Sequence, residues 1–183
     1  MSTGAYPDWG RAFDDLWRQL GPESKTALVE LLPDDWSFER KRVLDFGSGY
    51  GRTLTHFLPE AREAEVWGVD VDAAAIARLQ RELSPPMHGA TCRPDPPLDF
   101  EDGYFDLAWA ISVFTHLTDN SVAWLLELHR LLQPSGLLIA TFMGRSHAEL
   151  FTGKPWDEDK VGMNVLRHDQ PHSEGGPMVM MSD

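Results

Sequence analysis

The chain has 183 residues and a formal net charge of −13, from 16 Lys and Arg against 29 Asp and Glu. That balance disfavours nucleic acid and anionic lipid as partners, because affinity for phosphate groups rests mainly on basic side chains. Cys92, the single cysteine, excludes an intrachain disulfide and fits a reducing compartment. The first residues lack the pattern of a signal peptide, and no run approaches the ~20 apolar residues of a membrane span. We therefore expect a cytoplasmic, single-domain protein.

Short apolar runs alternate with amphipathic stretches, a pattern typical of a parallel sheet covered by helices. Strands are expected at 42–46, 66–70, 87–93, 104–111 and 136–142. Helices are expected at 9–20 (ended by Gly21-Pro22), 23–32, 53–58, 73–83 (capped by Asp72) and 118–133. The expected fold class is α/β, with a Rossmann-like, doubly wound, mostly parallel sheet and helices on both faces.

The end of the chain differs from the rest in composition. It is rich in Gly, Pro and charge, carries five of the seven methionines from Met143 onward, and offers only one short strand, at 178–181. We therefore expect either that the sheet lacks its terminal strand pair or that the chain is truncated before it. We divide the single domain into an N-terminal helical cap (1–40), a cofactor-binding α/β core (41–143) and an irregular C-terminal segment (144–183). An incomplete sheet edge would favour a homodimer or association with another domain.

A glycine-rich loop, Asp-Phe-Gly-Ser-Gly-Tyr-Gly at 45–51, lies between a predicted strand and a predicted helix. Glycines allow a tight turn and let a ligand approach the backbone, and the N-terminus of the following helix would offer free N–H groups. Asp70 ends the next strand, nineteen residues after Gly51. A carboxylate at that position can accept hydrogen bonds from both ribose hydroxyls. The pattern predicts a nucleoside ligand.

The charge and spacing of the loop indicate which nucleoside. The dinucleotide fingerprint requires its third glycine at position 52, which holds Arg52. Asp45, two residues before the first glycine, suits a cationic ligand and would repel a pyrophosphate. The predicted ligand is a ribonucleoside that carries positive charge, and a nicotinamide-dependent oxidoreductase is the less favoured alternative.

These residues resemble a known family. Segments 43–51 and 68–72 look like the first two motifs of class I S-adenosylmethionine-dependent methyltransferases, and segments 100–106, 112–117 and 127–136 continue the likeness in the family's order. The resemblance implies S-adenosyl-L-methionine as the cofactor. It implies that the loop wraps the amino-acid part, that Asp70 holds the ribose and that Asp45 lies near the methionine ammonium. After the third strand, Asp95 is one step out of register with the family's adenine-reading residue.

The candidate site follows from these motifs. The expected cofactor contacts are Asp45, Gly47, Ser48, Gly49, Gly51, Asp70, Val71, Asp95 and Ser112. His116 is the candidate general base, because an imidazole changes charge near neutral pH; a histidine that shapes the pocket wall or bonds to backbone is the alternative. No metal site is expected, since Pro171 interrupts the His168, Asp169 and His172 cluster.

Other prominent residues have simpler interpretations. Tyr6, Trp9 and Trp17 would form either a lid over the cofactor or a core-packing helix. Asp106 is interpreted as structural, and His129 and Arg130 as a solvated helix face.

Together these features predict an S-adenosylmethionine-dependent methyltransferase that acts on a small-molecule acceptor by direct in-line methyl transfer. A non-catalytic S-adenosylmethionine-binding module is the main alternative. The acceptor is expected to be neutral or cationic, given the acidic charge of the chain.

Overall fold

The computed structural model describes residues 10–147, 156–157, 159, 162–166, 169–170 and 176–182. Tyr6, Trp9, His168 and His172 lie outside the described residues, as does the side chain of Trp17. Within these ranges, no helix combines the length and the apolar character that a membrane span requires.

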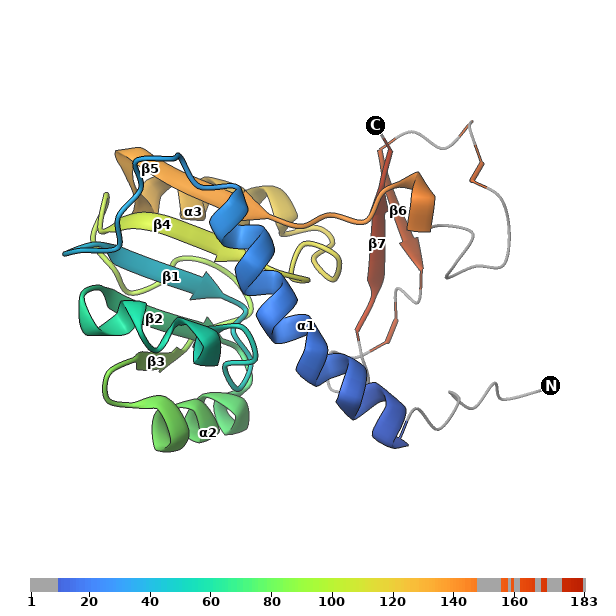
Figure 1. Cartoon of the computed structure of the whole chain (residues 1–183). Helices are drawn as coiled ribbons and strands as arrows, with labels where there is room; N and C mark the ends of the chain where they lie inside the picture. Colours follow the sequence, from blue (N-terminus) through green and yellow to red (C-terminus); the bar gives the residue numbers. More distant parts are fainter. Residues whose placement is uncertain are drawn as a thin grey trace.

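Five strands form one parallel sheet in the order β3-β2-β1-β4-β5. They are β1 (Arg42–Phe46), β2 (Glu65–Asp70), β3 (His88–Thr91), β4 (Phe105–Ala110) and β5 (Leu132–Ala140). Their carboxyl ends meet at one edge, on the right of the sheet in Figure 1. The strand order reverses between β1 and β4, and parallel sheets place their ligand crevice at such a point.

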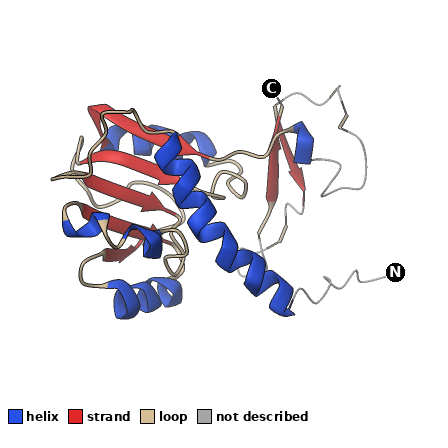
Figure 2. Ribbon diagram, viewed as in Figure 1, coloured by secondary structure: helices blue, strands red, loops and turns tan. Residues whose placement is uncertain are grey.

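Helices cover both faces of the sheet, so the doubly wound fold class is confirmed (Figure 2). One face carries α1 (Gly10–Glu30), the 3-10 helices η1 (Leu54–Phe57) and η2 (Glu60–Arg62), and α2 (Ala73–Leu83); the other carries α3 (Ser121–Leu131). Side chains alternate between the faces along a strand. Val43 therefore packs in the core with Ile76 of α2, and Leu44 packs in the opposite core with Trp124 of α3.

The predicted helix break at Gly21-Pro22 is wrong, because α1 runs through both residues. A Cβ at position 21 would lie 2.7 Å from the carbonyl oxygen of Arg52 and 2.7 Å from Nε2 of His56. Gly21 is therefore explained by close packing of α1 against the segment after β1. Lys25, one turn later, fixes the same contact by donating to the His56 carbonyl oxygen at 2.7 Å and to Glu60.

The helix expected at 53–58, after the glycine loop, is also not an α-helix. The segment forms the short 3-10 helices η1 and η2. Leu54 and Phe57, three residues apart, are both buried, which matches the three-residue turn of a 3-10 helix. Pro59 has no N–H to continue a helical ladder, so the turn restarts there.

The boundary between α3 and β5 differs from expectation as well. The helix ends at Leu131 and β5 begins at Leu132, before Pro134 and Gly136. Leu132 pairs with Phe105, but the next pair is Leu137 with Leu107. Pro134 lies inside this register shift, where its missing N–H breaks no ladder hydrogen bond.

A second, two-stranded sheet lies beyond the carboxyl ends of the main sheet (Figure 1). It pairs β6 (Met163–Leu166) with β7 (Met178–Met181) in antiparallel orientation. The strand expected at 178–181 is confirmed, and its partner β6 was not expected. Within the described residues, the main sheet ends at β5.

Candidate active site

The glycine loop is held by backbone hydrogen bonds to the end of β2. The N–H groups of Gly47 and Ser48 both donate to the Val69 carbonyl oxygen, at 2.8 and 3.1 Å. Gly49 N–H donates to Asp70 Oδ2 at 2.7 Å. The structure therefore brings together the loop and the acidic strand end that the sequence singled out, at the carboxyl ends of β1 and β2.

Gly47 and Gly49, two of the three loop glycines, have different structural roles. Both have a left-handed backbone, with φ of +76° at Gly47 and +54° at Gly49. A Cβ on Gly47 would overlap Cγ2 of Val113, so this glycine permits packing within the protein. A Cβ on Gly49 would have no heavy atom within 4 Å. Gly49 therefore presents open backbone, as expected where a ligand covers the chain.

Asp45 is a buried carboxyl group in the middle of the sheet edge. It is 3% exposed, and burial raises its pKa from 3.8 to about 7; Asp70 acts in the same direction, while Trp109 and Arg52 oppose the rise. The Trp109 indole N–H is close by but makes no hydrogen bond of normal geometry. A buried carboxyl group of this kind is stabilised in its charged form when a cation binds beside it.

Asp70 and Asp72 have distinct roles within two residues. Asp70 accepts from Gly49 through Oδ2 and from the Asp72 N–H through Oδ1 at 2.9 Å. Asp72 caps α2 by accepting from the N–H groups of Ala74 and Ala75, which confirms its predicted function. Between them, Val71 leaves 47% of its surface exposed at the strand ends, and an apolar side chain there offers a surface for a flat ring.

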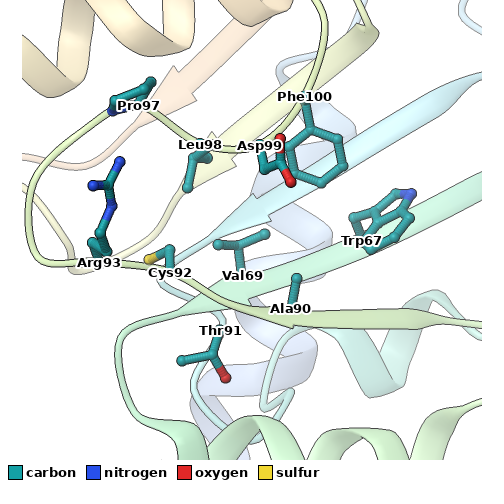
Figure 3. A pocket seen from close by; sticks show the side chains of 10 residues that line it. All are labelled: Trp67, Val69, Ala90, Thr91, Cys92, Arg93, Pro97, Leu98, Asp99 and Phe100. Atoms are coloured by element: carbon teal, nitrogen blue, oxygen red, sulfur yellow. The ribbon is translucent and has the colours of Figure 1, made fainter.

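A cavity of about 590 Å³ lies beside β2 and β3, beneath the loop that leads to β4 (Figure 3). Its wall is mostly apolar, from Trp67, Val69, Ala90, Pro97, Leu98 and Phe100, with Thr91, Cys92, Arg93 and Asp99 completing it. Burial raises the pKa of the Cys92 thiol to about 11, so this cysteine stays protonated and acts as a small apolar group. Asp95 is exposed on the same loop and accepts from Asn120 Nδ2 at 3.1 Å.

The wall of this cavity is anchored to α3 by Arg130, which corrects the expectation of a solvated face. Arg130 donates to the carbonyl oxygens of Leu98 and Phe100 and pairs with Asp102 and buried Glu127. These bonds hold the pKa of Glu127 below its usual range. Asp106 is structural as expected, accepting from Lys41 Nζ and the Arg42 N–H.

Ser112 and His116 lie on the turn after β4. Ser112 is exposed, with φ of +61°. His116 Nδ1 is 2.8 Å from the carbonyl oxygen of Pro177, just before β7. That oxygen can only accept, so Nδ1 carries a proton and Nε2 keeps its lone pair when the ring is neutral. The backbone bond foreseen as the alternative for His116 therefore leaves its other nitrogen available as a base.

Several residues around the site were not found from the sequence. Val113, Trp109, Thr141 and Pro177 each touch a candidate residue from elsewhere in the chain. Trp109, Thr141 and Pro177 lie outside the motifs, and Val113 lies within 112–117, a segment that gives no sign of the contact with Gly47 because that contact joins separate strand ends. The sequence singled out Arg52 only because it stands where a dinucleotide fingerprint requires a glycine. It did not indicate that the Arg52 charge acts on the Asp45 carboxyl group. Within the described residues, no three side chains of His, Cys, Asp or Glu gather as a metal site would require.

A sequence profile of the methyltransferase domain family matches residues 44–138, which is more than half of the chain. The chain belongs to the class I S-adenosylmethionine-dependent methyltransferase family. The matched region of this methyltransferase domain runs from β1 into β5 and includes the glycine loop, Asp70, Ser112 and His116.

Curated relatives agree with the assignment, and a solved structure shares the fold. The domain is 32% identical over 99 residues to the 2-methyl-6-phytyl-1,4-hydroquinone methyltransferase of a Synechocystis strain, covering 53% of this chain and 30% of that protein. It is 31% identical over 143 residues to the malonyl-[acyl-carrier protein] O-methyltransferase of Halorhodospira halophila, covering 76% and 47%. The fold matches the PH0226 protein of Pyrococcus horikoshii with a TM-score of 0.63 and 19% identity, over 98% of this chain and 82% of that one. The methyltransferase domain thus spans less than half of these two curated relatives.

Proposed function

We propose that this chain binds S-adenosylmethionine at the carboxyl ends of β1 and β2 and catalyses transfer of its methyl group to a small-molecule acceptor. The observation that carries the proposal is the joining of the open glycine loop to Asp70, with Gly49 N–H donating to the carboxylate at 2.7 Å. The same edge holds buried Asp45, which fits a cationic ligand. A pyrophosphate would meet two carboxylates there, which disfavours a dinucleotide.

The residues present fit the parts of the cofactor. Asp45 would hold the methionine ammonium, Gly47, Ser48, Gly49 and Gly51 would line the amino-acid part, and Asp70 would accept from the ribose hydroxyls. Val71 and Asp95, with Cys92 of the cavity wall, would take the adenine ring, and Ser112 would contact the cofactor from the turn after β4. When bound, S-adenosylmethionine supplies an electrophilic methyl group on its sulfonium.

The protein's own contribution is mainly to hold the acceptor close and in line, which can supply roughly 7–11 kcal/mol of the barrier. His116 would take a proton from the acceptor through Nε2, because Pro177 occupies Nδ1. Proton transfer by a positioned side chain adds about 10²- to 10⁴-fold in rate.

The acceptor class is inferred from the relatives. Their names give a hydroquinone and a malonyl group on acyl-carrier protein as acceptors. We therefore infer a small molecule with an ionisable oxygen or an activated carbon. Release of S-adenosylhomocysteine with a panel of phenols, hydroquinones and carboxylates tests this inference. Tight cofactor binding with no turnover on any of them would favour the non-catalytic module instead.

Calorimetric titration with S-adenosylhomocysteine tests the cofactor site. In Asp70→Asn we expect about 10- to 100-fold weaker binding, because a charged acceptor is lost. Asp72→Ala is the matched control: it removes only the cap of α2, costs about 1 kcal/mol of stability and leaves affinity unchanged. No binding to the unmodified chain, or equal binding by Asp70→Asn, would refute the proposal.

A further inference from the structure

Ser112 adopts a conformation that its residue type disfavours. Its φ of +61° lies in the left-handed region, at a position two residues beyond the last residue of β4. Non-glycine residues with positive φ are uncommon, and they persist where surrounding contacts hold them. A serine there needs a partner that fixes the turn.

Thr141 provides that partner from the neighbouring strand. The Ser112 N–H donates to Thr141 Oγ1 at 2.7 Å, and the Thr141 N–H donates to the Ala110 carbonyl oxygen at 3.1 Å. Thr141 follows directly after Ala140, the last residue of β5, which is paired with Ala110. One residue therefore binds the chain on both sides of Ile111, where β4 ends and the turn begins.

The turn at Ser112 fixes the positions of Val113, which packs on the glycine loop, and of the turn that carries His116. Val113 follows it, and its Cγ2 occupies the space that a side chain on Gly47 would need. The Val113 carbonyl oxygen accepts from the His116 N–H at 2.8 Å, which closes the turn that carries the imidazole. The backbone of Ser112 thus connects the cofactor loop with the candidate base.

We propose that Thr141 is a positioning residue, whose hydroxyl holds the left-handed turn at Ser112 and so aligns Val113 on the glycine loop and His116 beside the reacting groups. This inference rests on the proposed function. It predicts that loss of the Thr141 hydroxyl weakens the cofactor site and releases the His116 turn together, although Thr141 itself belongs to no motif of the sequence.

The test compares Thr141→Val, which keeps the shape but has no hydroxyl, with Thr141→Ser, which keeps the hydroxyl. In the valine variant we expect roughly three- to tenfold weaker S-adenosylhomocysteine binding and correspondingly faster hydrogen exchange of the Ser112 amide. The serine variant should behave as the unmodified chain in both measurements. Thermal melts of all three proteins report whether each is folded.

A second pair of variants separates the backbone from the Ser112 hydroxyl. In the Thr141→Val background, Ser112→Gly should bind S-adenosylhomocysteine more tightly than Ser112→Ala, because glycine adopts positive φ without support. Ser112→Ala loses the same hydroxyl, keeps the strained backbone and should recover nothing.

The outcomes distinguish this inference from the function on which it rests. Equal affinity and equal Ser112 exchange in Thr141→Val and the unmodified chain would overturn the role of Thr141 while leaving cofactor binding intact. Equal recovery by glycine and alanine would overturn the backbone explanation. Absence of binding by the unmodified chain would overturn the proposed function itself, and the exchange of the Ser112 amide would still report on the hydrogen bond.

Discussion

The candidate site has two halves, one at the carboxyl ends of β1 and β2 and one at the carboxyl ends of β4 and β5, and the two are held together in different ways. At β1 and β2, the chain folds on itself over short distances: the loop at 47–51 binds Val69 and Asp70 through backbone N–H groups. At β4 and β5, single bonds join distant segments, as from Ser112 to Thr141 and from His116 to Pro177. The Val179 N–H also donates to the Thr115 carbonyl oxygen at 2.8 Å, which attaches β7 to the same turn.

This difference matches the two tasks of a methyl transferase. A cofactor is the same molecule in every member of the family, so a compact backbone cradle can serve it. An acceptor differs between enzymes, and a surface assembled from several segments can change one segment at a time. We therefore expect variants on the β1 and β2 side to act on cofactor affinity alone, and variants on the β4 and β5 side to act on the alignment of His116 as well, because Val113 also contacts Gly47 of the cofactor loop.

Replacement of Asp45 by asparagine should have the largest effect on binding. We expect about 100-fold weaker affinity for S-adenosylhomocysteine at pH 7.5, because the ammonium loses its charged partner. Calorimetry checks the loss. In the unmodified chain, affinity should rise as pH increases through about 7 and Asp45 loses its proton. It should fall again at higher pH, where the ligand's α-amino group becomes neutral.

The same variant should be more stable than the unmodified chain at high pH. Below pH 3.8 Asp45 is protonated in both folded and unfolded chains, so it favours neither. Between 3.8 and about 7 the unfolded chain releases the proton and the folded chain keeps it, so stability falls as pH rises. Above that range Asp45→Asn should therefore gain on the order of a few kcal/mol. Thermal melts at pH 4 and pH 8 measure the gain, and equal melting temperatures at pH 8 would contradict it.

Alanine at Gly47 and at Gly49 should separate packing from ligand contact. Gly47→Ala places a Cβ against Val113 and should cost about 2–4 kcal/mol of stability. Gly49→Ala meets open space and should cost only about 1–2 kcal/mol from its left-handed backbone. Gly49→Ala should still bind S-adenosylhomocysteine at least about tenfold more weakly, because the methyl group enters the ligand's space.

The control for both is Gly144→Ala. A Cβ there meets no atom within 4 Å, and its φ lies outside the left-handed region. Its stability and affinity should match those of the unmodified chain. A Gly49→Ala variant that binds normally would place the ligand away from this loop.

The smallest effect on stability is expected at His116. Asparagine can place an N–H near the Nδ1 position, so His116→Asn should keep the bond to Pro177 and lose little stability. His116→Ala should lose about 1 kcal/mol. Nitrogen-15 spectra of the imidazole at pH 8 should show a proton on Nδ1 and none on Nε2, and the reverse tautomer would remove His116 from its proposed role.

Much of the fold could be predicted from the sequence where local chemistry decides it. Strand β1 matches its expected residues, and Asp72 caps α2 as its position before an apolar stripe indicated. The failures occur where tertiary contacts override local preference. The sequence predicts that Gly21 ends a helix, but in the structure this glycine allows α1 to pack closely against Arg52 and His56. The sequence predicts that Arg130 lies on a solvated helix face, but in the structure its guanidinium holds the loop from Leu98 to Asp102.

The site follows the same rule. Asp45 and the loop glycines form one short motif, and Asp70 ends the next strand at the position where nucleotide-binding folds place a ribose carboxylate, so their association could be predicted. Thr141 and Pro177 reach the site only because β5 and β7 end beside β4. Their spacings from Ser112 and His116 are 29 and 61 residues, far beyond any local signal.

The attachment of β7 has a consequence for how this domain can diversify. Its anchoring bonds to Thr115 and Met143 use main-chain atoms only, with the Met181 N–H donating to the Met143 carbonyl oxygen at 2.8 Å. Substitutions along β7 therefore leave those attachments chemically unchanged. Because Met178, Val179 and Met180 are buried, substitutions that keep their apolar character can be accepted there while the imidazole next to the strand keeps its orientation.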